Sequence, residues 1–362
     1  MKTNFRFFLL WLALPVFIFL QACDDGEDPL PATGFRGFFV VNEGGFGNSN
    51  TSLSIVNTDE NSITNNIFLT ANNRPLGDQA QSMTKYGGRG YVMVQNSGKV
   101  EVINTVNFTS LGTISERVQS PRYFVGVSDT KAYLSDWGST GFDGSVKVID
   151  LSTLQVTDSI ATGQGANRML LHNEFLYVTN NGGFGRDSTV TVIDRRTDTV
   201  VDQLVVGNNP NSLAHDAQGN VWVLAGGYLA FDANFNLVPE QSVPGSLSKL
   251  NPDGSEAFRL MLPEITFNGA DNLQSSPDGL MLYFTYNGGL YRVPTTGNTL
   301  PASAFIEKDF YGLAIDQHSG GNIIGCIAPD FSSPGTVEVY DPTGNLLQSY
   351  EAGIAPNGIT FR

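Results

Sequence analysis

Polar side chains that could hold a ligand recur through the sequence at intervals of roughly 43 to 47 residues, the spacing of a structural repeat. Amide, carboxylate, hydroxyl and guanidinium groups donate and accept hydrogen bonds, and together they suit a ligand rich in carbonyl or hydroxyl groups. The alternative is structural, because Asn and Asp also bond the backbone of tight turns. The candidates for ligand contact are Arg74, Asp78, Gln79, Asn167, Arg168, Asn211, Asp271, Asn272, Tyr311 and Asn357, and the same stretches contain Arg122 and Tyr123.

Aromatic side chains next to glycines form a second group of candidates. Two stretches, residues 42–48 and 180–186, match almost residue for residue, and further stretches of this kind follow other predicted strands. Such rings offer flat apolar surface to a ligand, although each ring could instead fill its own loop. Because several of them should share one rim, we expect a binding face. The rings are Phe46, Trp137, Phe142, Phe184, Tyr228 and Phe331.

Short β-strands must position these groups. An apolar strand recurs in seven copies, and an alternating strand that ends in Asn, Asp or Pro follows each copy. Four strands per repeat without a helical pattern predict an all-β fold, a seven-bladed β-propeller of four-stranded blades at residues 35–362. The apolar strands begin at Phe38, Tyr91, Ala132, Leu176, Val221, Leu282 and Ile323.

The two ends of this region are expected to share one blade. The segment from Pro356 to Phe361 matches the inner strand of the other repeats, and the remaining strands of that blade would run from Phe38 to about Phe68. The C-terminal strand would then close the ring and remove the open sheet edges, giving one domain. The loops between second and third strands and the segments between blades emerge on one face, which we call the top face. The ligand candidates lie in those loops and segments, and the polar candidates between blades, Arg74 among them, are expected close to the axis, where the inner strands begin.

Two resemblances to known families accompany this pattern. Leu176-Tyr177-Val178-Thr179-Asn180, with Val192-Ile193-Asp194 after it, resembles the YVTN family of bacterial propellers over residues 35–362. Such motifs indicate fold far better than function.

A second resemblance lies near the N-terminus. Val41-Asn42-Glu43-Gly44, together with Leu76-Gly77-Asp78-Gln79-Ala80-Gln81, resembles surface propeller lipoproteins that capture vitamin B12 beside outer-membrane transporters in gut Bacteroidetes. This resemblance implies a corrinoid such as cobalamin as ligand and a TonB-dependent outer-membrane transporter as partner.

Catalytic chemistry based on histidine is not expected. His172, His215 and His318 fall in predicted turns on the face opposite the top face, where no ligand on the top face can reach them. One enzyme class remains as an alternative, because some propeller lactonases hold calcium on the axis with oxygen ligands. Glu43, Asn167, Asn211 and Asp271 could supply such oxygens here.

The N-terminus resembles that of a bacterial lipoprotein. Lys2 and Arg6 precede an apolar run that ends in Leu20-Gln21-Ala22-Cys23, similar to a lipobox in which Cys23 receives the lipid. We therefore expect a signal peptide at residues 1–22, lipidation at Cys23 and an acidic tether at residues 23–34. The acidic run after Cys23 resembles the signal that sends lipoproteins of Bacteroidetes-type bacteria to the cell surface, whereas in enteric bacteria an Asp there favours inner-membrane retention.

Charge and cysteine content limit the remaining function classes. The formal net charge is −15, which makes nucleic acid and anionic lipid surfaces poor partners. Cys326 is the second of two cysteines and lies in an apolar run, so we expect a buried side chain and no disulfide framework.

The sequence thus predicts a non-catalytic, lipid-anchored protein of the outer membrane that binds a ligand at the cell surface. It needs no cofactor, and a corrinoid is the expected ligand. A calcium-dependent lactonase or hydrolase and a surface module that binds protein or glycan remain as alternatives.

Overall fold

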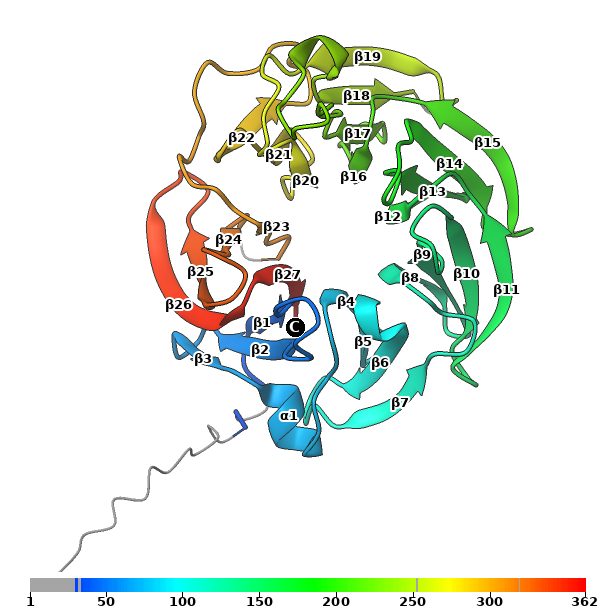
Figure 1. Ribbon diagram of the computed structural model, residues 1–362. Coiled ribbons are helices and arrows are strands. Elements are labelled where there is room, and N and C mark those ends of the chain that lie inside the picture. Colours follow the sequence, from blue (N-terminus) through cyan, green and yellow to red (C-terminus); the bar gives the residue numbers. More distant parts are fainter. Residues whose placement is uncertain (1–29, 32–33, 252, 319) are drawn as a thin grey trace, which may run out of the picture.

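The computed structural model describes residues 30–31, 34–251, 253–318 and 320–362. Within them, antiparallel strands form seven sheets arranged as blades around one axis (Figure 1). The seven-bladed β-propeller expected from the repeats is confirmed. The signal peptide expected at residues 1–22 and the lipidation site Cys23 lie outside the described residues, as does most of the tether expected at residues 23–34.

Blades 1 to 4 each contain four strands, and their order runs from the axis outwards. Blade 1 consists of β27 (Pro356–Phe361), β1 (Gly37–Asn42), β2 (Ser52–Asn57) and β3 (Ser62–Thr64). Blade 2 consists of β4 (Ala80–Tyr86), β5 (Arg89–Val94), β6 (Lys99–Asn104) and β7 (Ser110–Ile114). Blade 3 consists of β8 (Pro121–Ser128), β9 (Lys131–Asp136), β10 (Ser145–Asp150) and β11 (Gln155–Ala161). Blade 4 consists of β12 (Ala166–His172), β13 (Phe175–Asn180), β14 (Thr189–Asp194) and β15 (Thr199–Val205).

Blades 5 to 7 complete the ring. Blade 5 consists of β16 (Pro210–His215), β17 (Val221–Ala225), β18 (Ser246–Leu250) and β19 (Glu256–Met261). Blade 6 has three strands, β20 (Asp271–Ser275), β21 (Met281–Tyr286) and β22 (Gly289–Pro294). Blade 7 consists of β23 (Gly312–Ile315), β24 (Ile323–Ile327), β25 (Pro334–Tyr340) and β26 (Leu346–Ile354). The described chain also contains the helix α1 (Ile67–Asn72) and the 3-10 turns η1 (Gln95–Ser97) and η2 (Pro239–Gln241).

The two ends of the propeller meet in blade 1, as expected. β27 pairs antiparallel with β1, with Phe361 opposite Phe38 and Ile359 opposite Val40. At the lower end of these strands, the amide of Arg362 donates to the carbonyl of Gly37 at 3.0 Å, and the Arg362 guanidinium lies over the ring of Phe35. The last strand of the chain therefore supplies the inner edge of the first blade and closes the ring.

Two segments differ from the four-strand expectation. Blade 6 lacks a fourth strand, and an isolated bridge between Leu290 and Ile306 takes its place. The residues after β22 alternate poorly and include Gly297 and Pro301, which do not favour a strand. In blade 1, β3 ends at Thr64 and α1 follows, so the expectation of strand structure to about Phe68 is wrong.

The reason for α1 lies in the spacing of its apolar residues. Ile67 and Phe68 are adjacent and pack in the same hydrophobic cluster, whereas successive residues of a strand would face opposite sides of the blade. A helix places both on one side together with Ala71, and all three pack against the core between blades 1 and 2.

The core lies between neighbouring blades, because each blade is covered on both faces. This explains the continuous apolar runs: Phe38, Phe39, Val40 and Val41 are all buried, with alternate residues facing different neighbours. Cys326 is fully buried and free, as expected from its apolar surroundings, and burial raises the pKa of its thiol above the ordinary range.

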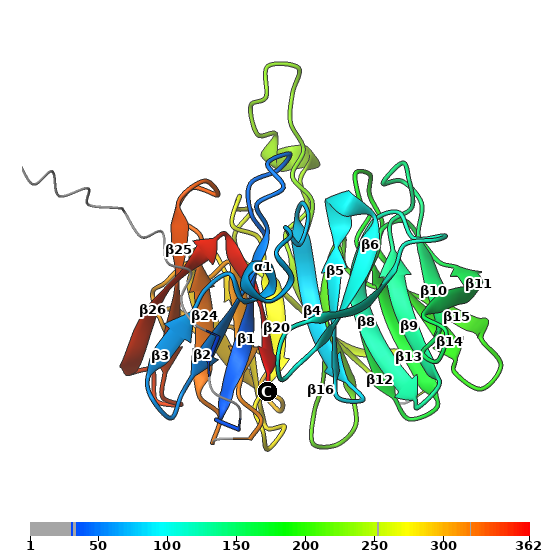
Figure 2. The same ribbon diagram turned by 90° about the horizontal axis from the view of Figure 1, so that it is seen from below.

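The top face carries the long loops. The segment between β17 and β18 projects furthest from it, and η2 lies within that segment (Figure 2, yellow-green). Among the residues that the structure describes, no helix has the length and apolar character that crossing a membrane requires.

We predict that Phe39→Ala lowers the free energy of unfolding by about 3–5 kcal/mol, because it leaves a cavity between blades 1 and 2. The Phe39 side chain is fully buried and contacts the ring of Phe108 edge-on. The matched control is Phe46→Ala, which makes the same chemical change at a side chain that is 73% exposed. Urea denaturation followed by circular dichroism measures both. Equal stability of the two variants would contradict the assigned packing.

Candidate functional site

A repeated irregularity of the inner strands builds the wall of the axial channel. In six blades the inner strand shifts register near its start, so that one or two of its residues lack a directly paired residue on the neighbouring strand; we call the first of them the bulge residue of that blade. These side chains line a central cavity of about 740 Å³. They are Gln81, Arg122, Asn167, Asn211, Asn272 and Asn357.

Most of these side chains donate a hydrogen bond to the following blade. Asn211 Nδ2 donates to the carbonyl of Ala270 at 2.7 Å, and Asn272 Nδ2 donates to the carbonyl of Tyr311 at 3.2 Å. Asn357 Nδ2 reaches the carbonyls of Ala80 and Gln81, while Gln81 Nε2 donates to the hydroxyl of Tyr123. Arg122 follows the same rule through Nε, which donates to Asn167 Oδ1 at 3.3 Å. The alternative that these polar residues serve the fold is therefore correct in part, because they join neighbouring blades and also line the cavity.

Glu43 is the hydrogen-bond centre on one side of the cavity. Its carboxylate accepts from the Tyr311 hydroxyl, from Gln79 Nε2 at 3.4 Å and from Asn357 Nδ2 at 3.4 Å. Burial raises the pKa of Glu43 above its ordinary value of 4.5, although the Tyr311 hydroxyl and the positive charge of Arg122 act in the opposite direction. Burial and the neighbouring Glu43 also raise the pKa of Tyr311.

Two guanidinium groups stand on the facing wall. Arg122 from β8 lies over the ring of Trp137 at 4.0 Å and also donates to Gln95 Oε1. Arg168 from β12 lies over the ring of Tyr123 at 4.2 Å. Burial lowers the pKa of Arg122, and the nearby Arg168 adds to this effect. Both guanidinium groups line the cavity.

The four residues considered for calcium all line the cavity, and their side-chain oxygens accept hydrogen bonds within the protein. Asn167 Oδ1 accepts from Arg122, and Glu43 accepts from three neighbouring donors. Ser212 Oγ donates to Asn211 Oδ1 and to Asp271 Oδ1. Across residues 30–31, 34–251, 253–318 and 320–362, no group of three or more His, Cys, Asp or Glu side chains could hold a metal ion.

Aromatic side chains stand exposed on the top face around this cavity. Phe184 is 71% exposed and contacts Phe142, and Phe331 is 49% exposed and contacts Tyr311 edge-on. Phe46 is as exposed as Phe184. The two matching loops share a reason for their shape, since Gly44 and Gly182 both adopt a positive φ (79° and 88°) that favours glycine.

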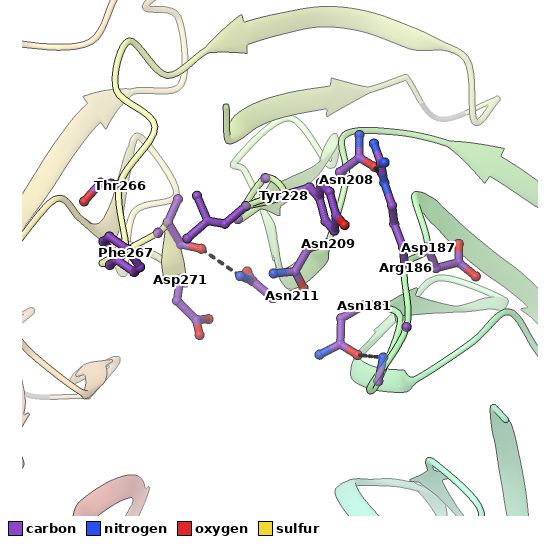
Figure 3. A pocket seen from close by; sticks show the side chains of 17 residues that line it. Asn181, Arg186, Asp187, Asn208, Asn209, Asn211, Tyr228, Thr266, Phe267 and Asp271 are labelled. Carbon is purple, nitrogen blue, oxygen red and sulfur yellow. Dashed lines mark hydrogen bonds between the residues drawn. The ribbon is translucent and has the colours of Figure 1, made fainter. Parts of the chain in front are cut away.

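A smaller pocket of about 410 Å³ adjoins the cavity, between the loops of blades 4, 5 and 6 (Figure 3). Asn181, Asn209, Asn211 and Asp271 contribute to both spaces. Tyr228 lines this pocket, with the guanidinium of Arg186 over its ring at 4.2 Å. Tyr228 was expected from the sequence, but several residues that line the pocket with it were not. The long loop that begins at Gly226 was a signal that could have pointed to them. Those residues are Asn181, Arg186, Asn208 and Phe267.

Three expected ligand contacts lie elsewhere. Arg74 forms an ion pair with Glu101 at 2.6 Å beneath the outer strand of blade 2, so the expectation that it lies near the axis is wrong. Asp78 is buried and accepts from the amide of Gly47 and from Asn96, which joins two top loops. Trp137 is only 8% exposed, because Arg122 and Phe184 cover it, so it supports the rim from below.

The remaining ligand candidates line the central cavity. They are Gln79, Asn167, Arg168, Asn211, Asp271, Asn272, Tyr311 and Asn357. Two histidines lie at the opposite end of the ring, since His172 and His215 are the last residues of β12 and β16 and their rings are 5.8 Å apart.

We predict that Glu43→Gln becomes more favourable for stability as the pH rises. A carboxyl group whose pKa is raised by folding stabilises the protein fully below its unfolded pKa, and this contribution is lost as the pH rises through the folded pKa. The neutral glutamine avoids that loss, while its oxygen still accepts from Tyr311. Thermal unfolding between pH 4 and pH 8 should show a midpoint difference, variant minus wild type, that grows with pH. Glu116→Gln, at an exposed site, is the control, and a difference that stays constant across this range would refute the assignment.

Comparison with solved structures shows the same fold in proteins of different description. A quinonprotein alcohol dehydrogenase-like protein from Bacteroides thetaiotaomicron is 13% identical, with a TM-score of 0.66 over 90% of this chain and 78% of that chain. A candidate 6-phosphogluconolactonase from Bacteroides fragilis is 13% identical, with a TM-score of 0.62 over 92% and 100%. The hydrazine synthase of Kuenenia stuttgartiensis is 14% identical, with a TM-score of 0.60 over 76% and 86%. At these identities the likeness shows the fold alone.

The sequence itself matches one family model. No curated protein matches the chain significantly. The model of DUF5074, a domain of unknown function, matches residues 36–260, which extend from β1 to β19 and make up more than half of the chain. The chain therefore belongs to the DUF5074 family.

Proposed function

We propose that this chain is a non-catalytic ligand-binding lipoprotein, held at the cell surface through lipid on Cys23, that captures a ligand on its top face. The observation that carries the proposal is the combination of exposed aromatic rings around a polar cavity. Phe46, Phe184 and Phe331 offer apolar surface at the rim, and amides and guanidinium groups line the interior. Ligand sites commonly combine apolar walls with a few placed polar groups.

A corrinoid is the ligand that we propose. The corrin ring is a broad disc edged with amide side chains, which can stack on rim aromatics and exchange hydrogen bonds with the cavity amides. The two motifs that resemble the vitamin B12-capturing lipoproteins meet in the cavity wall, where Gln79 Nε2 donates to Glu43 Oε1. That contact supports a role for both motifs in ligand binding.

Non-covalent capture fits the chemistry of the cavity wall. The Glu43 carboxylate is engaged by donors from the protein, and His172 and His215 lie at the far end of the ring. A captured ligand would pass unchanged to a partner, for which we propose a TonB-dependent outer-membrane transporter.

The test is calorimetric titration of residues 35–362, which contain every strand of the closed ring, with cyanocobalamin and separately with calcium. We expect one-to-one binding of cyanocobalamin and no binding of calcium. Absence of cyanocobalamin binding would reject the corrinoid, and tight calcium binding would favour the lactonase alternative.

We further predict that Phe184→Ala and Phe331→Ala each weaken cyanocobalamin binding by at least about tenfold, or about 1.4 kcal/mol, because each removes a ring from the rim. Both side chains are exposed, so the variants should fold. The control is Leu280→Ala, an exposed apolar residue in the turn between β20 and β21 on the opposite face. Unchanged affinity in both phenylalanine variants would exclude this rim as the binding face.

A further inference from the structure

One of the six bulge residues breaks the chemical pattern of the ring. Five are amides, whereas blade 3 carries Arg122. The amides show what the fold requires at this position, which is a donor that reaches the next blade, as in Asn211 and Asn272. Arg122 meets that requirement with Nε alone. The hydrogen bond to the next blade does not require a positive charge, and the charged guanidinium group of Arg122 lines the cavity.

A second positive charge lies beside it. Arg168 follows the bulge residue Asn167, at a position where the other five blades with this bulge carry Ser82, Tyr123, Ser212, Leu273 and Gly358. Its guanidinium forms no hydrogen bond and no ion pair with any other described residue, although several arginines elsewhere in the chain are paired with carboxylates. Five N–H donors of Arg168 thus remain for a ligand.

The acidic side chains that line the cavity, Glu43 and Asp271, form no ion pair with Arg122 or Arg168. Glu43 attracts Arg122 electrostatically but forms no ion pair with it, and its carboxylate is held by Tyr311. Asp271 belongs to blade 6, two blades further around the ring from Arg168, and accepts from Ser212 Oγ. Two like charges that share a partly desolvated cavity repel each other, and an anion between them would offset that repulsion.

The two guanidinium groups are also held in place before any ligand arrives. Each lies over an aromatic ring, with Arg122 Cζ 4.0 Å from the centre of the Trp137 ring and Arg168 Cζ 4.2 Å from the centre of the Tyr123 ring. Trp137 is buried in turn and contacts Phe184. A fixed planar guanidinium presents paired N–H donors that match the oxygens of carboxylate and phosphate groups.

We propose that Arg122 and Arg168 form an anion subsite in the central cavity, which binds a carboxylate or phosphate group of the captured ligand. This inference deepens the proposed function by naming the charge of the ligand, and it rests on capture at the top face. Cyanocobalamin carries one such group, its phosphodiester, so the two proposals are compatible.

The experiment titrates residues 35–362 with inorganic phosphate and, separately, with acetate, at constant ionic strength set with chloride. Calorimetry and the thermal unfolding midpoint report binding. The variants are Arg122→Gln, which introduces the residue type that blade 2 carries at Gln81, and Arg168→Gln. Arg117→Gln is the matched control, because Arg117 is an exposed arginine that lines neither the central cavity nor the adjoining pocket. Unchanged circular dichroism of the variants confirms that they fold.

We expect saturable binding of at least one of the two anions, weakened at least tenfold by Arg122→Gln and by Arg168→Gln and unchanged by Arg117→Gln. Preference for phosphate or for acetate identifies the group. Absence of binding by both anions, or equal binding by all variants, would overturn the subsite. Titration with cyanocobalamin separates the two proposals. Cyanocobalamin binding without an anion effect leaves the capture function and rejects the subsite, whereas an anion effect without cyanocobalamin binding leaves the subsite and rejects the corrinoid.

Discussion

Hydrogen bonds between successive inner strands, close to the axis, hold this ring together. Each inner strand has one edge that no other strand covers, and bulge residues such as Asn211 and Asn272 reach from there to the next blade. The same side chains form the wall of the cavity. A ligand therefore meets polar groups that the fold has already oriented, and little entropy is lost in ordering them.

Because the bulge residues both join the blades and line the cavity, the first role limits which residues can replace them without loss of the fold. An amide at the bulge is sufficient for the bond to the next blade, so additional chemistry at that position is free to serve binding. At Arg122 the two roles can be distinguished. Nε makes the hydrogen bond to the next blade, and the positive charge of the guanidinium group is not needed for that bond. In a chain with a formal net charge of −15, Arg122 and Arg168 place two positive groups in one cavity, whose lining also includes Glu43 and Asp271.

Much of the architecture could be predicted from the sequence, because strand alternation and a repeat period depend on local residue order. The closure of β27 onto β1 followed from the same pattern. Positions of individual side chains depend on partners distant in the sequence and were less accessible. Arg74 was expected near the axis, yet it forms an ion pair with Glu101 away from the axis. The sequence around either residue does not predict that ion pair. Trp137 was expected on the rim, yet stacking by Arg122 covers it.

The place of β1 within blade 1 has a mechanical consequence. The chain enters the propeller at Gly37, and β1 lies between β27 on one side and β2 on the other. A pulling force applied at that entry along the strand would load both hydrogen-bond ladders in shear at once, instead of unzipping one bond after another. A propeller that is pulled through β1 would therefore withstand a larger force before it unfolds. A propeller pulled through an outer strand such as β3, which pairs with a single neighbouring strand, would unfold at a smaller force.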